Sequence, residues 1–238
     1  PNGYRIAGNF WKRADETLTF ALAPRAAMAS FQFVHASDTH ISEQSVQRTR
    51  RLRQLVDSVR PAFAVISGDL VRDALRVPEA EARGYYELFV RERSAFRAPV
   101  YTAPGNHEIF GIETEKSGVQ PSHPLFGKAM YRSYLGPDYY SFNVGGVHFV
   151  ALNTVDVAGQ WYHGHVDSLQ LAWLARDLAL LPPRTVVVTF NHIPFYSSSE
   201  TLNGYDDGPP APTLITLNGK TTFRHSVSNA AKVLAVLA

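Results

Sequence analysis

Residues 31–40 read FQFVHASDTH, and they show the pattern from which the fold class is predicted. Its first half is a short run of aromatic and β-branched residues, typical of a buried strand, and its end carries Asp38 and His40. An apolar run that ends in polar residues returns at residues 62–69, 100–108 and 185–192. Helical patterns separate several of these runs, at residues 43–59, 79–94 and 168–180. Strands that alternate with helices in this way predict a layered α/β domain.

Two further apolar runs, residues 139–144 and 147–152, flank Gly145 and Gly146. Two glycines between apolar runs favour a two-residue hairpin, so we expect an antiparallel pair and therefore mixed sheets. The stretches 111–138 and 197–222 show no clear periodicity and are expected to be long irregular loops that carry binding residues.

Residues 1–30 read differently from the rest of the chain. Residues 17–22 have the pattern of a short strand, and residues 26–30 are small and linker-like. The strand fits an edge strand of the main domain and, equally, the tail of a preceding β-rich domain. We interpret residues 1–30 as a linker or such a tail, and residues 31–238 as the main domain.

The composition of the chain disfavours several classes of protein. It has 238 residues, a formal net charge of +2 and no cysteine. Disulfides and zinc–thiolate sites are therefore excluded within it, and a dedicated nucleic-acid binder is not indicated. The densest basic run, Arg48–Arg53, lies in a helical pattern and is interpreted as a solvated helix face. No stretch approaches the ~20 apolar residues of a membrane-spanning helix, so no membrane partner is expected.

Each apolar run of the alternating pattern ends in residue types that bind metals. In open α/β sheets, ligands bind beyond the carboxyl ends of the strands. We therefore expect one edge of the sheet to gather the side chains of Asp38, His40, Asp69, Asn106 and His192. Carboxylate, imidazole and amide groups together suit iron, manganese or zinc. A central carboxylate can bridge two ions about 3.5–4 Å apart, a spacing that holds both a phosphate and an attacking hydroxide.

The motifs occur in the order Asp-x-His, Gly-Asp, Gly-Asn-His-Glu and then Asn-His after a strand. This set, which spans residues 33–195, resembles the calcineurin-like metallophosphoesterase family. Residues 170–174, which read QLAWL, and the following Asp177 and Leu178 are most similar to bacterial enzymes grouped with cyclic-nucleotide phosphodiesterases and purple acid phosphatases. The resemblance implies an α/β metallophosphoesterase fold, with mixed β-sheets flanked by helices.

The resemblance also implies a role for each ligand position. Asp38 and His40 would bind a first metal ion, Asn106 and His192 would bind a second, and Asp69 would bridge both. The two ions would be iron, manganese or zinc. Such a centre would hydrolyse a phosphate monoester or diester of a small molecule by attack of a metal-bound hydroxide.

His107 and Glu108 are the catalytic residues that the resemblance implies. His107 would protonate the leaving oxygen or stabilise charge on the phosphoryl oxygens, and Asn106 and His107 would contact the substrate. Glu108 would orient His107. Many relatives carry Asp at this position, so Glu is a mild departure.

A second departure concerns the end of the chain. The family completes its site with a Gly-His-x-His motif, and nothing after His192 fits it. His225 lies in the wrong context, and His163 and His165 precede His192. We therefore expect the motif beyond Ala238, which would make the chain a fragment that lacks the C-terminal part of the fold.

Several other residues are weaker candidates. Four histidines without partner spacing are expected to be structural, with the first a packed neighbour of the site: His35, His123, His148 and His163. Three residues of the late loop are explained equally well as loop residues or as substrate contacts: Tyr196, Asn203 and Tyr205.

Two alternatives to a small-molecule phosphoesterase stay open. A nuclease is disfavoured by the weak basic charge. A metal-free scaffold that binds a protein partner would be expected to lose ligands, yet each ligand position within the chain is filled. No Asp-Arg-Gly follows Asp69, which counts against the protein Ser/Thr phosphatases. The expected partner is a small phosphorylated molecule, the oligomeric state is open, and the subgroup favours a periplasmic or secreted bacterial protein.

Overall fold

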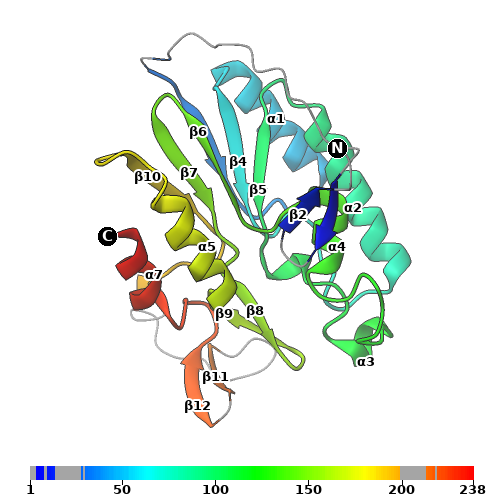
Figure 1. The fold of residues 1–238 in the computed structure, drawn as a ribbon. Coiled ribbons are helices and arrows are strands. Elements are labelled where there is room, and N and C mark those ends of the chain that lie inside the picture. The colour runs from blue at the N-terminus through cyan, green and yellow to red at the C-terminus, as the bar shows by residue number, and fades with distance from the viewer. Residues whose placement is uncertain (1–3, 8–9, 14–27, 29, 199–212, 218) are drawn as a thin grey trace.

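The structure is a computed structural model that describes residues 4–7, 10–13, 28, 30–198, 213–217 and 219–238 (Figure 1). The expected strand at residues 17–22 lies outside the described residues, and so do Asn203 and Tyr205. No helix among the described residues is both long enough and apolar enough to cross a membrane.

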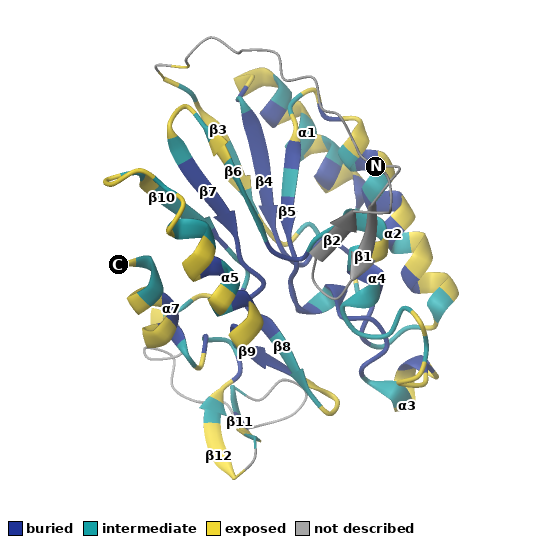
Figure 2. Ribbon diagram, viewed as in Figure 1, coloured by how far each residue is buried: buried dark blue, intermediate teal, exposed yellow. Residues whose placement is uncertain are grey.

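The first of two central sheets is parallel and has the strand order β3-β4-β5. Its strands are β3 (Phe33–Ala36), β4 (Phe63–Ser67) and β5 (Val100–Ala103). β4 is buried along its whole length, because it has a neighbour on each side and a layer on each face (Figure 2). The continuous apolar run of residues 63–66 is what such a strand requires.

The second sheet is mixed and has the order β10-β7-β6. β6 (Tyr140–Val144) and β7 (Val147–Ala151) form the expected antiparallel hairpin around Gly145 and Gly146, with Val144 opposite Val147. β10 (Val186–Phe190) pairs with β7 in parallel.

The two sheets pack face to face through aromatic side chains. Phe63 of β4 lies with its ring centroid 5.0 Å from that of Phe149 on β7 and 5.4 Å from that of Phe142 on β6. Both contacts are edge-to-face, the arrangement that favours the positive edge of one ring against the negative face of the other. The core between the sheets thus fixes how the two sets of strand ends face each other.

Helices cover the outer face of each sheet, which makes four layers (Figure 1). α1 (Val46–Val59) and α2 (Glu79–Ser94) pack on the first sheet through buried residues that include Val56 and Phe89. α5 (Ser168–Leu178) and α7 (Ala230–Leu237) pack on the second, through Leu174 and Val233 among others. The mixed, helix-flanked fold expected from the sequence is confirmed.

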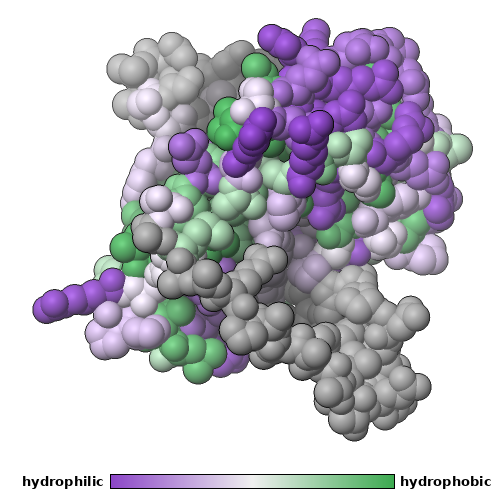
Figure 3. Space-filling view, turned by 90° about the horizontal axis from the view of Figure 1, so that it is seen from above, coloured by the Kyte–Doolittle hydropathy of each residue, from purple (hydrophilic) through white to green (hydrophobic). Residues whose placement is uncertain are grey.

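The basic run of α1 is partly paired and partly solvated. Arg50 lies 2.8 Å and Arg53 lies 3.8 Å from the carboxylate of Glu92, while Arg48 and Arg51 are exposed. Figure 3 shows hydrophilic residues covering much of the molecule on the side where α1 and α2 lie in Figure 1. The run is thus a helix face with one buried ion-pair partner.

The two stretches expected to be irregular contain regular elements, and that expectation was wrong. The first holds α3 (Thr114–Ser117) and α4 (Ala129–Leu135). The second holds a hairpin of β11 (Leu214–Leu217) and β12 (Lys220–Phe223). These elements are too short to show a period, although Asn218-Gly219 is a strong hairpin signal in the sequence.

Two more antiparallel pairs complete the described chain. β1 (Tyr4–Ala7) pairs with β2 (Phe10–Arg13), and β8 (Val155–Ala158) pairs with β9 (Trp161–Gly164). The β8–β9 and β11–β12 pairs lie at the end of the molecule where β4 and β5 finish (Figure 1).

Candidate metal centre

The candidate ligands lie directly after four strands. Asp38 and His40 follow β3, and Asp69 follows β4. Asn106 and His107 follow β5 in a short 3-10 helix, η1 (Asn106–Glu108), and His192 follows β10. β3, β4 and β5 are parallel, so their carboxyl ends meet at one edge, and the face-to-face packing of the sheets brings the end of β10 to the same place.

Asp69 is the centre of this group. Its side chain is 7% exposed, and three imidazole Nε2 atoms surround its carboxylate: that of His192 at 3.3 Å, that of His40 at 3.6 Å and that of His107 at 3.8 Å. Asp38 lies next to it, 3.7 Å from His40 Nε2, with its side chain 55% exposed. Two groups of ligand atoms, each within 4.8 Å, therefore share Asp69: one with His40 and His107, the other with Asp38 and His192.

Backbone carbonyl groups fix the orientation of two of these rings. Nδ1–H of His192 donates to the carbonyl of Ser67 at 3.0 Å, which leaves Nε2 facing Asp69 and, at 3.2 Å, Oδ1 of Asn106. Nδ1–H of His107 donates to the carbonyl of Arg72 at 2.5 Å, which leaves its Nε2 toward Asp69. A carbonyl only accepts, so each bond sets the tautomer in which Nε2 can bind a metal or carry a proton. Every residue has a backbone carbonyl, so the sequence does not indicate which carbonyls accept these two hydrogen bonds.

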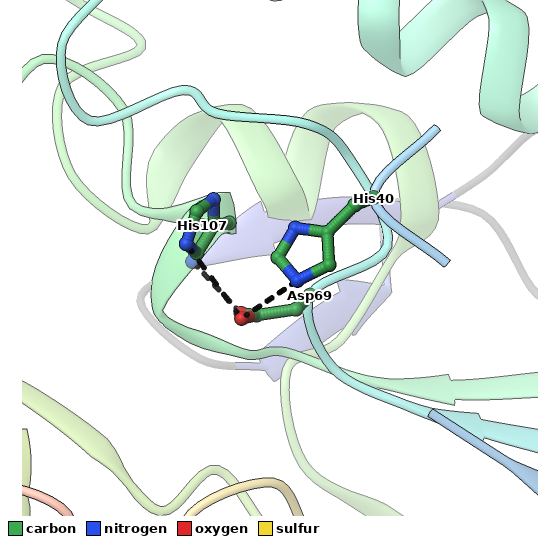
Figure 4. A group of neighbouring side chains, drawn as sticks. All are labelled: His40, Asp69 and His107. Carbon is green, nitrogen blue, oxygen red and sulfur yellow. Dashed lines mark hydrogen bonds and ion pairs between the residues drawn. The ribbon is translucent and has the colours of Figure 1, made fainter. Parts of the chain in front are cut away.

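His107, which the resemblance implies as a catalytic residue that contacts the substrate, lies among the candidate ligands. Its ring meets that of His40 edge to face, with centroids 4.5 Å apart (Figure 4). Both rings point at the carboxylate of Asp69. The geometry therefore allows His107 to be either a ligand or a group that faces the substrate.

Glu108 does not contact His107 through any described hydrogen bond, which differs from the orienting role expected of it. Its carboxylate is fully buried and accepts four backbone N–H groups, from Asp69, Leu70, Val71 and Gly105. Burial, together with the charge of Asp69, raises the pKa of Glu108 to about 7, while the N–H groups of Val71 and Gly105 favour the ionised form. Glu108 thus holds the loop after β4 against the loop after β5.

The backbone at the site is strained and tightly packed. Three residues adopt positive φ without being glycine: Asp38 at 57°, His40 at 39° and Asp69 at 48°. A Cβ on Gly68 would lie 2.5 Å from the ring of His192, and one on Gly105 would lie 2.3 Å from Asp69. Strained residues persist only where the surroundings force them, and they gather at functional sites.

The electrostatics of the group favour cations. Burial raises the pKa of Asp69, but the hydrogen bond and charge of His192 outweigh burial and bring the net shift downward. Burial lowers the pKa of His192, but the bond to Asp69 and its charge outweigh burial and raise the pKa to about 9. The nearly buried carboxylate of Asp69 thus stabilises the positive charge of His192, and it would stabilise the positive charge of a bound metal ion in the same way. The donor set of carboxylate, imidazole and amide oxygen fits two ions such as iron, manganese or zinc.

The other histidines have structural partners or lie apart from the group. His35 Nε2 bonds Ser67 Oγ at 2.7 Å beside the site, and burial lowers its pKa. His123 contacts Glu79, and His148 lies between Asn143 and Asp177. No group of His and acidic residues close enough to hold a metal, among those described, includes His163 or His225. Tyr196 is 69% exposed.

The fold and this site define a calcineurin-like phosphoesterase. A model of that family matches residues 31–218, and the chain belongs to the family. It is 24% identical over 185 residues to the 3',5'-cyclic adenosine monophosphate phosphodiesterase CpdA of Escherichia coli (strain K12), which covers 72% of this chain and 58% of that protein. It is 27% identical over 165 residues to the serine/threonine-protein phosphatase CPPED1 of Homo sapiens, covering 68% of this chain and 48% of that one.

Two further likenesses agree. Purple acid phosphatase 23 of Arabidopsis thaliana is 34% identical over 107 residues, which are 43% of this chain and 21% of that protein. The structure of a dimetal phosphatase from Danio rerio has the same fold, with a TM-score of 0.53 at 18% identity over 86% of this chain and 76% of that one. The chain spans about half the length of the curated relatives CpdA and CPPED1, 58% and 48%.

Proposed function

We propose that this protein is a metal-dependent phosphoesterase that hydrolyses a phosphate monoester or diester of a small molecule. The observation that carries the proposal is the nearly buried carboxylate of Asp69, with three imidazole nitrogens at 3.3–3.8 Å. Asp38, His40 and Asp69 would hold one ion, and Asp69, Asn106 and His192 would hold the other. When bound, the ions would supply Lewis acidity toward the phosphate and activate water for attack.

The chain's own residues then bind and orient the substrate and move a proton. The amide of Asn106 is 7% exposed and lies beside the ligands, where it can contact a phosphate oxygen as well as an ion. His107, tethered at Nδ1, presents Nε2 toward the same space. A proton on Nε2 can pass to the leaving oxygen of the ester, and the charged ring also stabilises phosphoryl oxygens.

Release of phosphate or alcohol from a panel of esters tests this function. The full-length protein would be stripped with a chelator and reloaded with manganese, iron or zinc, then given small monoesters, cyclic nucleotides, a phosphopeptide and DNA. We expect metal-restored turnover of at least one small ester. Turnover of DNA alone or of the phosphopeptide alone would contradict the proposal of a small-molecule substrate. The absence of turnover with any metal would support the scaffold alternative.

The nuclease and scaffold alternatives gain no support from the structure. Two arginines of the basic helix face are engaged by Glu92 rather than free for phosphates. The five expected ligands, which a scaffold would not need, converge on one site. Export from the cell stays a prediction.

A further inference from the structure

Arg224, just after β12, is a buried cation without a carboxylate partner among the described residues. The residue is 2% exposed. Its backbone is held on both sides, because its N–H donates to the carbonyl of Thr213 at 2.8 Å and its carbonyl accepts from Gly164 N–H at 3.0 Å. The backbone of Arg224 is therefore fixed where the end of β9 contacts the end of β12.

The guanidinium lies over two aromatic rings. Its central carbon lies 3.9 Å from the ring centre of Tyr162 and 5.0 Å from that of Trp161. Stacking of this kind fixes the plane of the fork and shields it from water, so that little freedom is left to lose when a ligand binds.

Two donors of this fork lack an acceptor in the described part of the chain, namely Nε and Nη1. Glu113, an acidic group whose charge acts on Arg224, already pairs with Arg76 at 2.7 Å and with Lys116 at 2.6 Å. A buried charged donor without an acceptor is costly, and such groups call for an unseen partner. Nε and Nη1 point along different edges of the guanidinium, and each can donate a charge-assisted hydrogen bond to an oxygen of a carboxylate or a phosphate.

The backbone of Arg224 is linked through Gly164 to the segment that follows β10 and carries His192. The guanidinium of Arg224 lies over the ring of Tyr162, and burial and, less strongly, the charge of Asp69 raise the pKa of the Tyr162 hydroxyl. Gly164 of the same strand packs against Ile193, next to His192, and a Cβ there would lie 2.8 Å from the Ile193 side chain. Arg76 adds a second cation nearby, and its loop is tied to His107 by the bond from Ala74 N–H to the His107 carbonyl.

We propose that Arg224 binds a second acidic group of the substrate, a carboxylate or a further phosphate, while the scissile phosphate lies at the metal centre. This rests on the proposed function and narrows it to phosphate esters that carry two anionic groups. Tyr162 and Trp161 hold the guanidinium in place for that contact.

Kinetics on a matched series of esters test the preference. The substrates are phosphates of straight-chain alcohols of several lengths whose far end is a methyl group, a carboxylate or a second phosphate. For the best chain length we expect kcat/KM to be about 10- to 100-fold higher with either anionic end than with methyl. Arg224→Gln and Arg224→Lys should lower this ratio, the first to near one, whereas the exposed control Arg176→Gln should keep it. A ratio near one in the wild type, or an equal loss in Arg176→Gln, would overturn the proposal.

A binding measurement keeps the site testable without turnover or a variant that folds poorly. In metal-free protein, inorganic phosphate should shift the NMR signal of Arg224 Nε–H, which is identified by its absence in Arg224→Lys. An unmoved signal at saturating phosphate would mean that another group of the protein holds the guanidinium, and the proposal would fall. If no ester is hydrolysed with any metal, the phosphoesterase function fails, while the phosphate titration still decides whether Arg224 is an anion site.

Discussion

Gly105→Ala tests whether close packing of the strand ends positions the metal-binding side chains. A Cβ at residue 105 would lie 2.3 Å from both the backbone nitrogen and Oδ1 of Asp69. Ordinary contact begins at 3.4 Å, so Asp69 must retreat by about 1.1 Å, the difference between the two distances. The φ of Gly105 is −104°, which any residue can adopt, so the effect of the substitution is steric.

This displacement sets the expected magnitudes. Overpacking of a tight site costs about 1–3 kcal/mol, and the smaller conformational entropy of unfolded Ala offsets about 0.4–1 kcal/mol of it. We therefore expect the free energy of unfolding to fall by about 1–2 kcal/mol. A misplacement of about 1 Å costs on the order of 100-fold in rate, so kcat/KM should fall by about that factor.

Urea unfolding, metal titration and ester hydrolysis would be compared with Gly84→Ala. Gly84 is exposed within α2, and a Cβ there would meet no atom within 4 Å. That control should raise the free energy of unfolding by about 0.5–1 kcal/mol and leave metal binding unchanged. If Gly105→Ala were as stable as the wild type, bound metal equally well and kept its activity within a few-fold, the argument from packing would be wrong.

Three further predictions concern the residues around Asp69. His107→Ala should lower kcat by about 10²–10⁴-fold with the metal content unchanged, measured by turnover and metal analysis; loss of an ion would instead make His107 a ligand. Glu108→Gln should lower the free energy of unfolding by about 1–3 kcal/mol, because buried N–H groups lose an acceptor, and unchanged urea stability would contradict its anchoring role. In metal-free protein, burial lowers the pKa of His192, but Asp69 outweighs burial and raises it from 6.5 to about 9. Their pairing therefore stabilises the fold fully at mildly acidic pH below 6.5, where Asp69 is still ionised, and is lost as the pH rises through 9 or falls far enough to protonate Asp69. Asp69→Asn should remove this pH dependence of unfolding and abolish turnover, and a persisting dependence would show that another group causes it.

The sequence predicted the strands and their chemistry because both are local signals. Four apolar runs read as buried strands, and each forms a strand, with polar residues after it that are visible without a structure. The expected burial is correct for β4 and nearly so for β5, but it is wrong for β3 and β10, which are edge strands with partly exposed residues. The rule that ligands bind at the carboxyl ends of strands was enough to bring Asp38, Asp69 and Asn106 together. It also covered His192, although that residue follows a strand of the other sheet.

What the sequence could not predict depends on contacts between distant segments. Glu108 reads as a neighbour of His107, yet its carboxylate binds amides of residues 69–71, far back in the chain. Arg224 reads as a surface cation, since charged residues are rarely buried without a partner, yet it is buried and its guanidinium lies over two aromatic rings. The hairpin β8–β9, which supplies those rings, has strands of only four residues each, too short for periodicity to reveal.

The strain at the centre explains why Glu108 is buried there. Three non-glycine residues, Asp38, His40 and Asp69, hold positive φ, at a cost of about 1–2 kcal/mol each for left-handed backbone. Local preference therefore opposes the geometry that brings their side chains together. The four hydrogen bonds from backbone N–H groups to the Glu108 carboxylate offset this conformational cost, because charge-assisted hydrogen bonds contribute about 1.5–3 kcal/mol where they are fully formed. A neutral or shorter residue at 108 would thus let the loop after β4 relax toward ordinary φ and carry Asp69 away from its three histidines, so the stability of the fold and the geometry of the site rest on the same carboxylate.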